Sequence, residues 1–405
     1  MLTKPDSAAH PVSLSPSRSQ SAVPMLDLRR QYQSIKEEVL AAVESVLATQ
    51  QSIGGPELAE FERESAAYLG VAATVGCASG TDALWLALQA SDVQPETAVI
   101  TTAFSFFATA SSITRCGAVP VFADIDPATL NLDPSSVAKI LDKAPVPVPR
   151  ALMPVHLYGQ CADMDRLAKL AQAHNIALVE DAAQGFGAAW RSRKAGSLGK
   201  AGGFSFYPTK NLSAYGDGGA VTTDDEELAA HVRSLRNHGS RRRYYHEEIG
   251  WNSRLDAIQA AVLRVKLKHI DSWNEQRRER AARYHELFLE SGLVKKGSDT
   301  VSPQAPVVLL QTLPAAYHIY HQFVVRTLRR DDLRSFLNKR GIGNEVYYPV
   351  PLHLQECFGY LGYKRGDLPE SERAADEVLA LPIFPELQDD EVQTVVAAIA
   401  DFYGR

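Results

Sequence analysis

The feature that most constrains the fold is a regular alternation of short β-rich runs with helical runs between residues 71 and 223. Strands that alternate with helices predict a largely parallel sheet wrapped by helices. We therefore expect an α/β fold in this region. The predicted strands are Ala98–Thr102, Val119–Ala123, Ala151–His156, Ala177–Glu180, Gly203–Phe206 and Ala220–Thr223.

The segments on either side of this region predict a second, smaller domain. A chain of 405 residues is long enough for more than one core. We expect a disordered extension at residues 1–24, a large domain at 25–270 and a small α+β domain at 271–405. The predicted elements outside the alternation are helices at Tyr32–Ala48, Pro56–Tyr68 and Arg330–Lys339, a strand at His321–Thr327, and a nearly continuous helix at Leu255–Glu290, which contains no proline or glycine.

Composition excludes several classes of protein. The net charge of −6 argues against a general nucleic-acid binder. No apolar run approaches the length of a membrane span, and the first residues lack the apolar core of a signal peptide. The four cysteines are far apart, without a metal-ligand spacing, so we expect reduced thiols, no metal and a cytoplasmic location. Those cysteines are Cys77, Cys116, Cys161 and Cys357.

The segment from Gly203 to Gly219 places one lysine, Lys210, between a short β-rich run and a glycine-dense loop. An amine in this position can approach a planar cofactor closely, because the glycines of the loop have no Cβ. If burial lowers its pKa, the free amine can form a Schiff base with an aldehyde. Taken alone, however, a lysine is more often a solvated surface charge.

Two acidic residues, Glu180 and Asp181, lie at the carboxyl end of the predicted strand Ala177–Glu180, and Gln184 follows them. Ligands bind at the carboxyl ends of strands in open α/β sheets. There, Asp181 can hold a pyridinium N–H and keep a pyridoxal ring protonated. The alternative is that Asp181 caps a following helix, and that Gln184 is a polar loop residue.

A third motif, Gly76–Leu88, resembles a Gly/Ser/Thr turn that leads into an apolar helix. Ser79, Gly80 and Thr81 would lie at the helix N-terminus, where free N–H groups and the helix dipole favour an anion such as phosphate. Ser205, five residues before Lys210, can add a hydroxyl to the same phosphate. The alternative is an ordinary capped helix, which the motif taken alone favours.

Together and in this order, the three motifs resemble the DegT/DnrJ/EryC1/StrS family of pyridoxal-phosphate sugar aminotransferases, within the fold-type I aspartate aminotransferase superfamily. The resemblance runs from about Leu26 to the C-terminus. Further segments that fit the family are Ser52–Glu57, Pro154–Gln160, Gly250–Ala261 and Tyr347–His353. The resemblance implies a large domain with a mostly parallel seven-stranded sheet between helices, and a small α+β C-terminal domain.

The resemblance also implies a role for each matching residue. Lys210 would be the Schiff-base lysine and the base that moves a proton, and Asp181 would pair with the pyridine nitrogen. Gln184 would lie near the ring and Phe106 would stack on it, although Phe106 alone reads equally well as a core aromatic. Gly80, Thr81 and Ser205 would hold the phosphate. Asn252 would reach the phosphate of the neighbouring subunit's cofactor, so that a homodimer would share its active sites.

The substrate end of the site is less determined. Tyr348 and His353 match family positions that line the sugar pocket, but a histidine beside two prolines can simply pack a loop. Arg243, in the run Arg241–His246, can meet a diphosphate or a sugar carboxylate, or can belong to a solvated basic loop.

The implied reaction transfers an amino group from L-glutamate to a keto-sugar linked to a nucleoside diphosphate, in amino-sugar biosynthesis for a surface polysaccharide or a glycosylated metabolite. Overall likeness favours 3-amination of a dTDP-6-deoxyhexose. A UDP-3-keto-hexuronate, whose carboxylate would suit the arginines, and a 4-keto-sugar are the alternatives. Dehydrating relatives carry histidine in place of the lysine, which argues against that reaction here. A non-catalytic regulatory protein on the same fold is an alternative of another class.

Overall fold

The computed structural model describes residues 23–143, 146–295, 297, 301–302 and 304–405. Most of the predicted disordered extension, residues 1–22, lies outside this range. Val23, at its end, is fully buried and forms a β-bridge with Ile342. The first described residues therefore pack on the C-terminal part of the chain. No helix in the described ranges is long and apolar enough to span a bilayer.

A seven-stranded sheet forms the centre of the large domain, in the order β1-β9-β8-β5-β4-β2-β3. All neighbours from β8 to β3 are parallel, whereas β9 is antiparallel to both β1 and β8. The predicted mostly parallel sheet is confirmed. The strands are β1 (Ala73–Cys77), β2 (Ala98–Thr102), β3 (Val119–Ala123), β4 (Pro149–Met153), β5 (Ala177–Asp181), β8 (Ala201–Ser205) and β9 (Gly219–Thr223).

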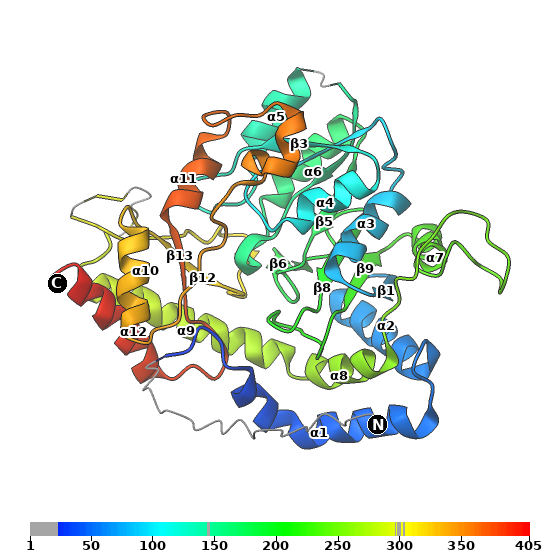
Figure 1. Cartoon of the computed structure of the whole chain (residues 1–405), viewed down its shortest axis with the longest axis horizontal. Coiled ribbons are helices and arrows are strands. Elements are labelled where there is room, and N and C mark those ends of the chain that lie inside the picture. Colours follow the sequence, from blue (N-terminus) through cyan, green and yellow to red (C-terminus); the bar gives the residue numbers. More distant parts are fainter. Residues whose placement is uncertain (1–22, 144–145, 296, 298–300, 303) are drawn as a thin grey trace, which may run out of the picture.

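Helices cover both faces of this sheet, because successive strand residues point to opposite sides. Val99 and its neighbour Ile100 belong to different apolar clusters. One face packs on α3 (Gly80–Ala90), α4 (Ala108–Arg115) and α7 (Glu226–Leu235). The other packs on α1 (Leu28–Thr49), α2 (Gly55–Leu69), α5 (Pro134–Asp142), α6 (Met164–Ala173) and α8 (Ala257–Leu267). Figure 1 shows α1 lying along the outside of α8.

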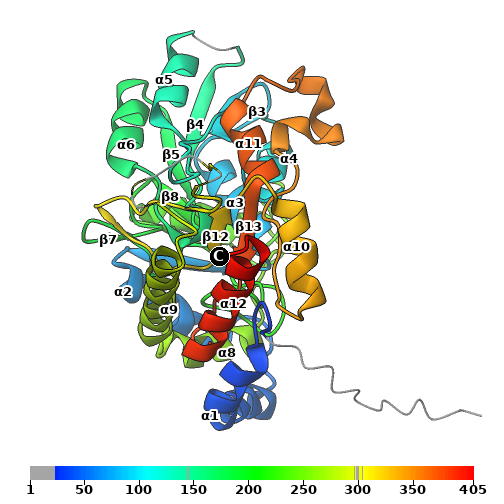
Figure 2. The same ribbon diagram turned by 90° about the vertical axis from the view of Figure 1, so that its left-hand side faces the viewer.

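The C-terminal part forms its own apolar cluster around an antiparallel sheet in the order β10-β12-β13. Figure 2 shows α10 and α12 beside β12 and β13, away from the large sheet. The elements are α9 (Ile270–Glu290), β10 (Val308–Leu309), β12 (Phe323–Arg326), α10 (Arg330–Lys339), α11 (Pro369–Glu377), β13 (Val378–Leu381) and α12 (Asp389–Phe402). Another small sheet consists of β6 (Ala189–Trp190), β7 (Arg193–Lys194) and β11 (Ala316–Tyr317). Short 3-10 helices occur at Leu157–Gly159, Leu352–Leu354 and Glu356–Leu361.

The predicted continuous helix Leu255–Glu290 is wrong in one respect, because it is divided between α8 and α9 at Lys268 and His269. The two halves pack on different partners: α8 contacts α1 and α2, whereas α9 contacts α12. Tertiary packing therefore interrupts a stretch whose local sequence favours uninterrupted helix.

Candidate active site

Lys210 lies in the connection between β8 and β9. This connection contains no crossover helix, which is why β9 returns antiparallel to β8. Its base is closed by two backbone hydrogen bonds, from the Phe206 N–H to the Gly218 carbonyl (2.8 Å) and from the Ala214 N–H to the Phe206 carbonyl (2.7 Å). The Lys210 N–H donates to the Tyr207 carbonyl (2.8 Å). The lysine is thus held in a closed loop at one end of the sheet.

Asp181 is the last residue of β5, and β5 is the parallel neighbour of β8. Because the carboxyl ends of the two strands lie at the same edge, Asp181 and the Lys210 loop face each other. Burial lowers the pKa of Lys210 to about 8, and the negative charge of Asp181 opposes this effect. The unprotonated form of the Lys210 amine is therefore far more populated near neutral pH than it is in a solvated lysine.

The Asp181 carboxylate is buried and has two donors. The Thr109 hydroxyl donates to it (2.7 Å), as does the N–H of Ala183 (3.2 Å). Burial raises its pKa above the ordinary value, and the Thr109 and Ala183 hydrogen bonds and the Lys210 charge offset this only in part. Turns rather than a helix follow Asp181, so the structure rejects the helix-cap alternative. Thr109 was not predicted; it lies in the first turn of α4, seven residues after the predicted strand Ala98–Thr102.

Gln184 joins Asp181's turn to the C-terminal part of the chain. Its Oε1 accepts from the backbone N–H of Tyr158 (2.6 Å), and its Nε2 donates to the hydroxyl of Tyr348 (3.0 Å). The Tyr348 ring lies 6.1 Å from the ring of Phe106, centre to centre. Phe106 is 57% exposed, which is unusual for a core aromatic and leaves its face free to contact a planar ligand. The structure therefore brings Gln184, Phe106 and Tyr348 together.

The predicted phosphate motif forms the first turn of α3. Ser79 is the N-cap, with extended backbone, and its hydroxyl accepts from the N–H of Asp82 (3.1 Å). The N–H groups of Gly80 and Thr81 lie where a helix provides no acceptor of its own, so they are available to an anion. Ser205 packs directly on Gly80: a Cβ at position 80 would lie 2.4 Å from the Ser205 Cβ.

The structure also explains how Glu180, the other half of the acidic pair, differs from Asp181. Glu180 is fully buried and accepts hydrogen bonds from the backbone N–H groups of Gly196, Leu198 and Gly199, each at 2.7 Å. The His156 Nε2 lies 2.8 Å from its Oε2. Glu180 therefore fixes the chain that enters β8, whereas Asp181 faces Lys210.

Three predicted residues, Asn252, Arg243 and His353, lie outside the cluster around Lys210 and Asp181. Asn252 is exposed and lines a depression of about 420 Å³ together with Ala78 and Gly216. Arg243 lies in an exposed loop over the ring of Tyr244 (4.9 Å).

His353 is buried, with its Nε2 3.2 Å from a carboxylate oxygen of Glu372 and its ring 5.9 Å from that of Tyr363. Its burial lowers its pKa, which the Glu372 carboxylate partly offsets. These contacts match the loop-packing alternative, and a contact with the sugar stays a prediction.

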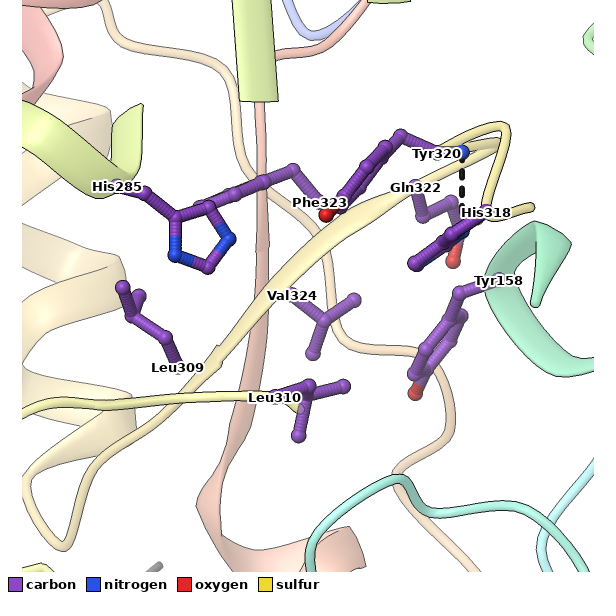
Figure 3. A pocket seen from close by; sticks show the side chains of 9 residues that line it. All are labelled: Tyr158, His285, Leu309, Leu310, His318, Tyr320, Gln322, Phe323 and Val324. Atoms are coloured by element: carbon purple, nitrogen blue, oxygen red, sulfur yellow. Dashed lines mark hydrogen bonds between the residues drawn. The ribbon is translucent and has the colours of Figure 1, made fainter. Parts of the chain in front are cut away.

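A second cavity lies behind Tyr158 and has a volume of only about 10 Å³ (Figure 3). His285, Gln322 and the stacked rings of His318 and Tyr320 line it. That volume corresponds to about one water molecule, so this cavity is too small for a substrate.

The residues at the edge of the large sheet fit pyridoxal phosphate. A buried carboxylate, an amine of lowered pKa and a helix N-terminus that a glycine keeps open provide partners for the ring nitrogen, the aldehyde and the phosphate, respectively. Within the described ranges, no group of three or more His, Cys, Asp or Glu side chains is arranged to hold a metal ion.

Comparison with known proteins agrees with this geometry. The sequence profile of the DegT/DnrJ/EryC1/StrS aminotransferase family matches residues 33–400. A pleiotropic regulatory protein of Geobacillus stearothermophilus is 48% identical over 94% of this chain and 98% of its own length. The dTDP-3-amino-3,4,6-trideoxy-α-D-glucose transaminase of Streptomyces venezuelae is 43% identical, covering 95% and 97%.

The same fold is found among solved structures. The crystal structure of S. venezuelae DesV in complex with a ketimine intermediate superposes with a TM-score of 0.87, at 44% identity, over 95% of this chain and 99% of that one. The expected fold-type I architecture and the expected class of enzyme, a pyridoxal-phosphate-dependent aminotransferase, are thereby confirmed. The chain belongs to the DegT/DnrJ/EryC1/StrS aminotransferase family.

Proposed function

We propose that this protein transfers the amino group of L-glutamate to the C3 keto carbon of a 6-deoxyhexose linked to dTDP. The observation that carries the proposal is the half-buried Lys210 side chain opposite Asp181, where burial lowers the pKa of its amine. The choice of sugar is supported by the relatives, among which a dTDP-3-amino-trideoxyglucose transaminase is 43% identical. A UDP-3-keto-hexuronate is the second candidate, because a UDP-2-acetamido-2-deoxy-3-oxo-D-glucuronate aminotransferase is 37% identical over 94% of the chain.

Pyridoxal phosphate supplies an aldehyde that condenses with amines and a ring that accepts electrons. The residues present would hold it at three points. Gly80 and Thr81, with the Ser205 hydroxyl, would bind the phosphate. Asp181 would hold the proton on the ring nitrogen, with Thr109 fixing the orientation of the carboxylate. Phe106 would cover one face of the ring.

Lys210 would act at its Nζ, first as the amine that binds the cofactor and then as the base that takes up a proton and returns it. A general base works best when its pKa lies near the operating pH. The pKa of about 8 meets this condition, whereas a solvated lysine would be almost fully protonated. An amine held in one place by the closed loop would return the proton to one face of the sugar carbon and so fix the configuration.

A second copy of the chain would complete the site. Asn252 is exposed here and would reach the neighbouring subunit's phosphate. The loop that carries it projects beside α7 (Figure 1) and exposes large apolar side chains: Tyr244 is 79% exposed, Ile249 86% and Trp251 49%. Exposed apolar groups of this size are typical of an interface. We propose a homodimer on these grounds, and a cytoplasmic location because Cys77, Cys116, Cys161 and Cys357 are free thiols.

The sugar nucleotide would enter beside Tyr348, whose hydroxyl is held by Gln184. Arg243 is proposed to meet the diphosphate from its exposed loop, and His353 to support the pocket from behind through Glu372. Arg243→Ala should raise the KM for the nucleotide sugar and leave the half-reaction with glutamate unchanged. Equal effects on both half-reactions would exclude this role.

A regulatory function on the same fold is the alternative of another class, since a relative carries that description. Lys210→Ala separates the two: a purely binding role survives the substitution, whereas transamination does not.

The test of the enzymatic proposal is the visible absorbance of the purified protein with pyridoxal phosphate, before and after L-glutamate, beside a Lys210→Ala control. We expect a band in the wild type that glutamate shifts, followed by reversal of the shift when a dTDP-3-keto-6-deoxyhexose is added. A bound cofactor that glutamate does not change would exclude glutamate as donor. Failure to take up the cofactor would exclude the aminotransferase reaction.

A further inference from the structure

A second buried lysine, Lys266, lies on α8 next to the loop that carries Lys210. Only 1% of Lys266 is exposed. Its Nζ lies 2.9 Å from the Ser213 hydroxyl and 4.2 Å from the centre of the Tyr215 ring. Across the described residues, this amine forms no ion pair, and no carboxylate shifts its pKa. Its two contacts are therefore both with the segment that follows Lys210.

A glutamine two turns earlier on α8 contacts the same segment. Gln259 accepts from the backbone N–H of Tyr215 (2.8 Å) and donates to its carbonyl (3.5 Å). Residues seven apart lie on one face of a helix, so Gln259 and Lys266 act together. Gly216 allows this approach, because a Cβ there would lie 3.2 Å from the Gln259 Nε2. Helix α8 thus contacts residues 213–216 in two ways: Gln259 binds the backbone of Tyr215, and Lys266 binds the side chains of Ser213 and Tyr215.

The contact with α8 holds the part of the Lys210 loop that leads back to β9, residues 213–216. The base of the loop is closed at Phe206, Ala214 and Gly218 by backbone hydrogen bonds. Lys210 lies four residues before Ala214, in the part that extends from this base. When residues 213–216 are held against α8, the short segment between Lys210 and Ala214 limits where the Lys210 backbone can lie. Displacements of about 1 Å at a reacting group reduce rates by as much as about 100-fold.

A stabilising role alone does not explain Lys266. A buried ammonium without a carboxylate partner is unfavourable, and burial lowers its pKa to about 7. Methionine has nearly the same length and carries no charge, so it would fill the same space without that cost. The contribution of Lys266 is therefore the geometry that it imposes through Ser213 and Tyr215.

We propose that Lys266 is a positioning residue, which together with Gln259 holds residues 213–216 and so sets the location of the Lys210 amine. The importance of that location rests on the proposed function, in which Lys210 is the reacting amine. The order that Lys266 imposes on the loop does not depend on it.

The test compares Lys266→Met and Ser213→Ala with a matched control, Lys268→Met. Lys268 lies two residues further on, is exposed, and lies 4.0 Å from Glu38. The first measurement is hydrogen exchange of the peptide that covers residues 207–218 in the cofactor-free protein. We expect about tenfold faster exchange in Lys266→Met and Ser213→Ala, no change in the control, and an unfolding midpoint for Lys266→Met that is not lowered.

The second measurement is steady-state kinetics with the cofactor bound. We expect kcat to fall about tenfold in Lys266→Met, with the KM for the nucleotide sugar within about twofold of the wild type, and partial recovery in Lys266→Arg. Unchanged exchange in both variants would overturn the proposal, as would a loss of kcat that merely follows a loss of stability. If Lys266→Met does not fold, Ser213→Ala decides by the same criterion. Faster exchange in a protein that does not transaminate would refute the proposed function and leave the positioning role intact.

Discussion

Replacement of Gly80 by alanine tests how tightly α3 must approach β8. An ideal Cβ at position 80 would lie 2.4 Å from the Cβ of Ser205, 2.8 Å from its Oγ and 3.0 Å from its Cα. Optimal carbon–carbon contact is about 3.5–4.0 Å. Either α3 or β8 must therefore move by roughly 1 Å, and the rigid strand backbone at Ser205 leaves the first turn of α3 as the part that shifts.

Gly80→Ala should lower both the stability of the fold and the affinity for the cofactor, and the two effects can be measured separately. Overpacking in a close-packed interior costs about 1–3 kcal/mol, so Gly80→Ala should lower the free energy of unfolding by that amount, measured with a chemical denaturant on the cofactor-free protein. Displacement of the Gly80 and Thr81 N–H groups should also weaken phosphate binding, at about 1 kcal/mol for each hydrogen bond lost. Fluorescence titration with pyridoxal phosphate should then show a dissociation constant raised by about tenfold or more.

Gly359→Ala is the matched control, because nothing lies within 4 Å of a Cβ at that exposed position. It should leave both measurements unchanged. Ser205→Gly in the Gly80→Ala background removes the closest contact and should recover part of the stability. If Gly80→Ala has the same unfolding midpoint and the same affinity for the cofactor as the wild type, the close approach of α3 to β8 does not require a glycine at position 80.

Three further predictions concern the core and the charges of the site. Phe61→Ala should cost about 3–5 kcal/mol of stability in denaturant unfolding, since Phe61 is fully buried with its ring 5.5 Å from that of Phe206 at the base of the Lys210 loop. Asp181→Asn should slow the absorbance change with L-glutamate by about 100-fold or more, because the amide does not hold a protonated ring nitrogen; an unchanged rate would exclude that role. Lys210 has a pKa of about 8 in the folded protein against 10.5 as its ordinary value, so the unfolded chain binds more protons between these values. The free energy of unfolding of the cofactor-free wild type should therefore rise relative to that of Lys210→Met between pH 8 and pH 10.5, by roughly 3 kcal/mol at most. If the difference between the two proteins stays constant across that range, the lowered pKa of the Lys210 amine is contradicted.

Local patterns predicted the sheet well, because strand and helix periodicity depend on neighbouring residues. The bounds predicted for β2, β3 and α10 match the structure, and the other predicted strands differ by a few residues at their ends. The first strand, Ala73–Cys77, was missed. Its Gly76 weakens the strand pattern, and its pairing partner β9 lies about 145 residues away in the chain.

The candidate site was predicted less evenly. Asp181, Gln184 and Lys210 follow predicted strands, Ser205 lies in one, and Gly80 begins a predicted helix; the structure gathers all five at one edge of the sheet. Thr109 and Lys266 carried no comparable signal. A threonine after a strand and a lysine in an amphipathic helix acquire their significance only from the buried groups that they touch.

By itself, then, the sequence determined most of the segments that become strands and helices, and that its chemistry-bearing residues lie near the ends of these elements. Only the tertiary structure decided the direction of β9, the break between α8 and α9, the burial of His353 against Glu372, and the grip of α8 on the Lys210 loop. The physical reason is that periodicity is a property of consecutive residues. Hydrogen-bond partners, burial and the pKa values that follow from burial depend on segments that only packing brings together.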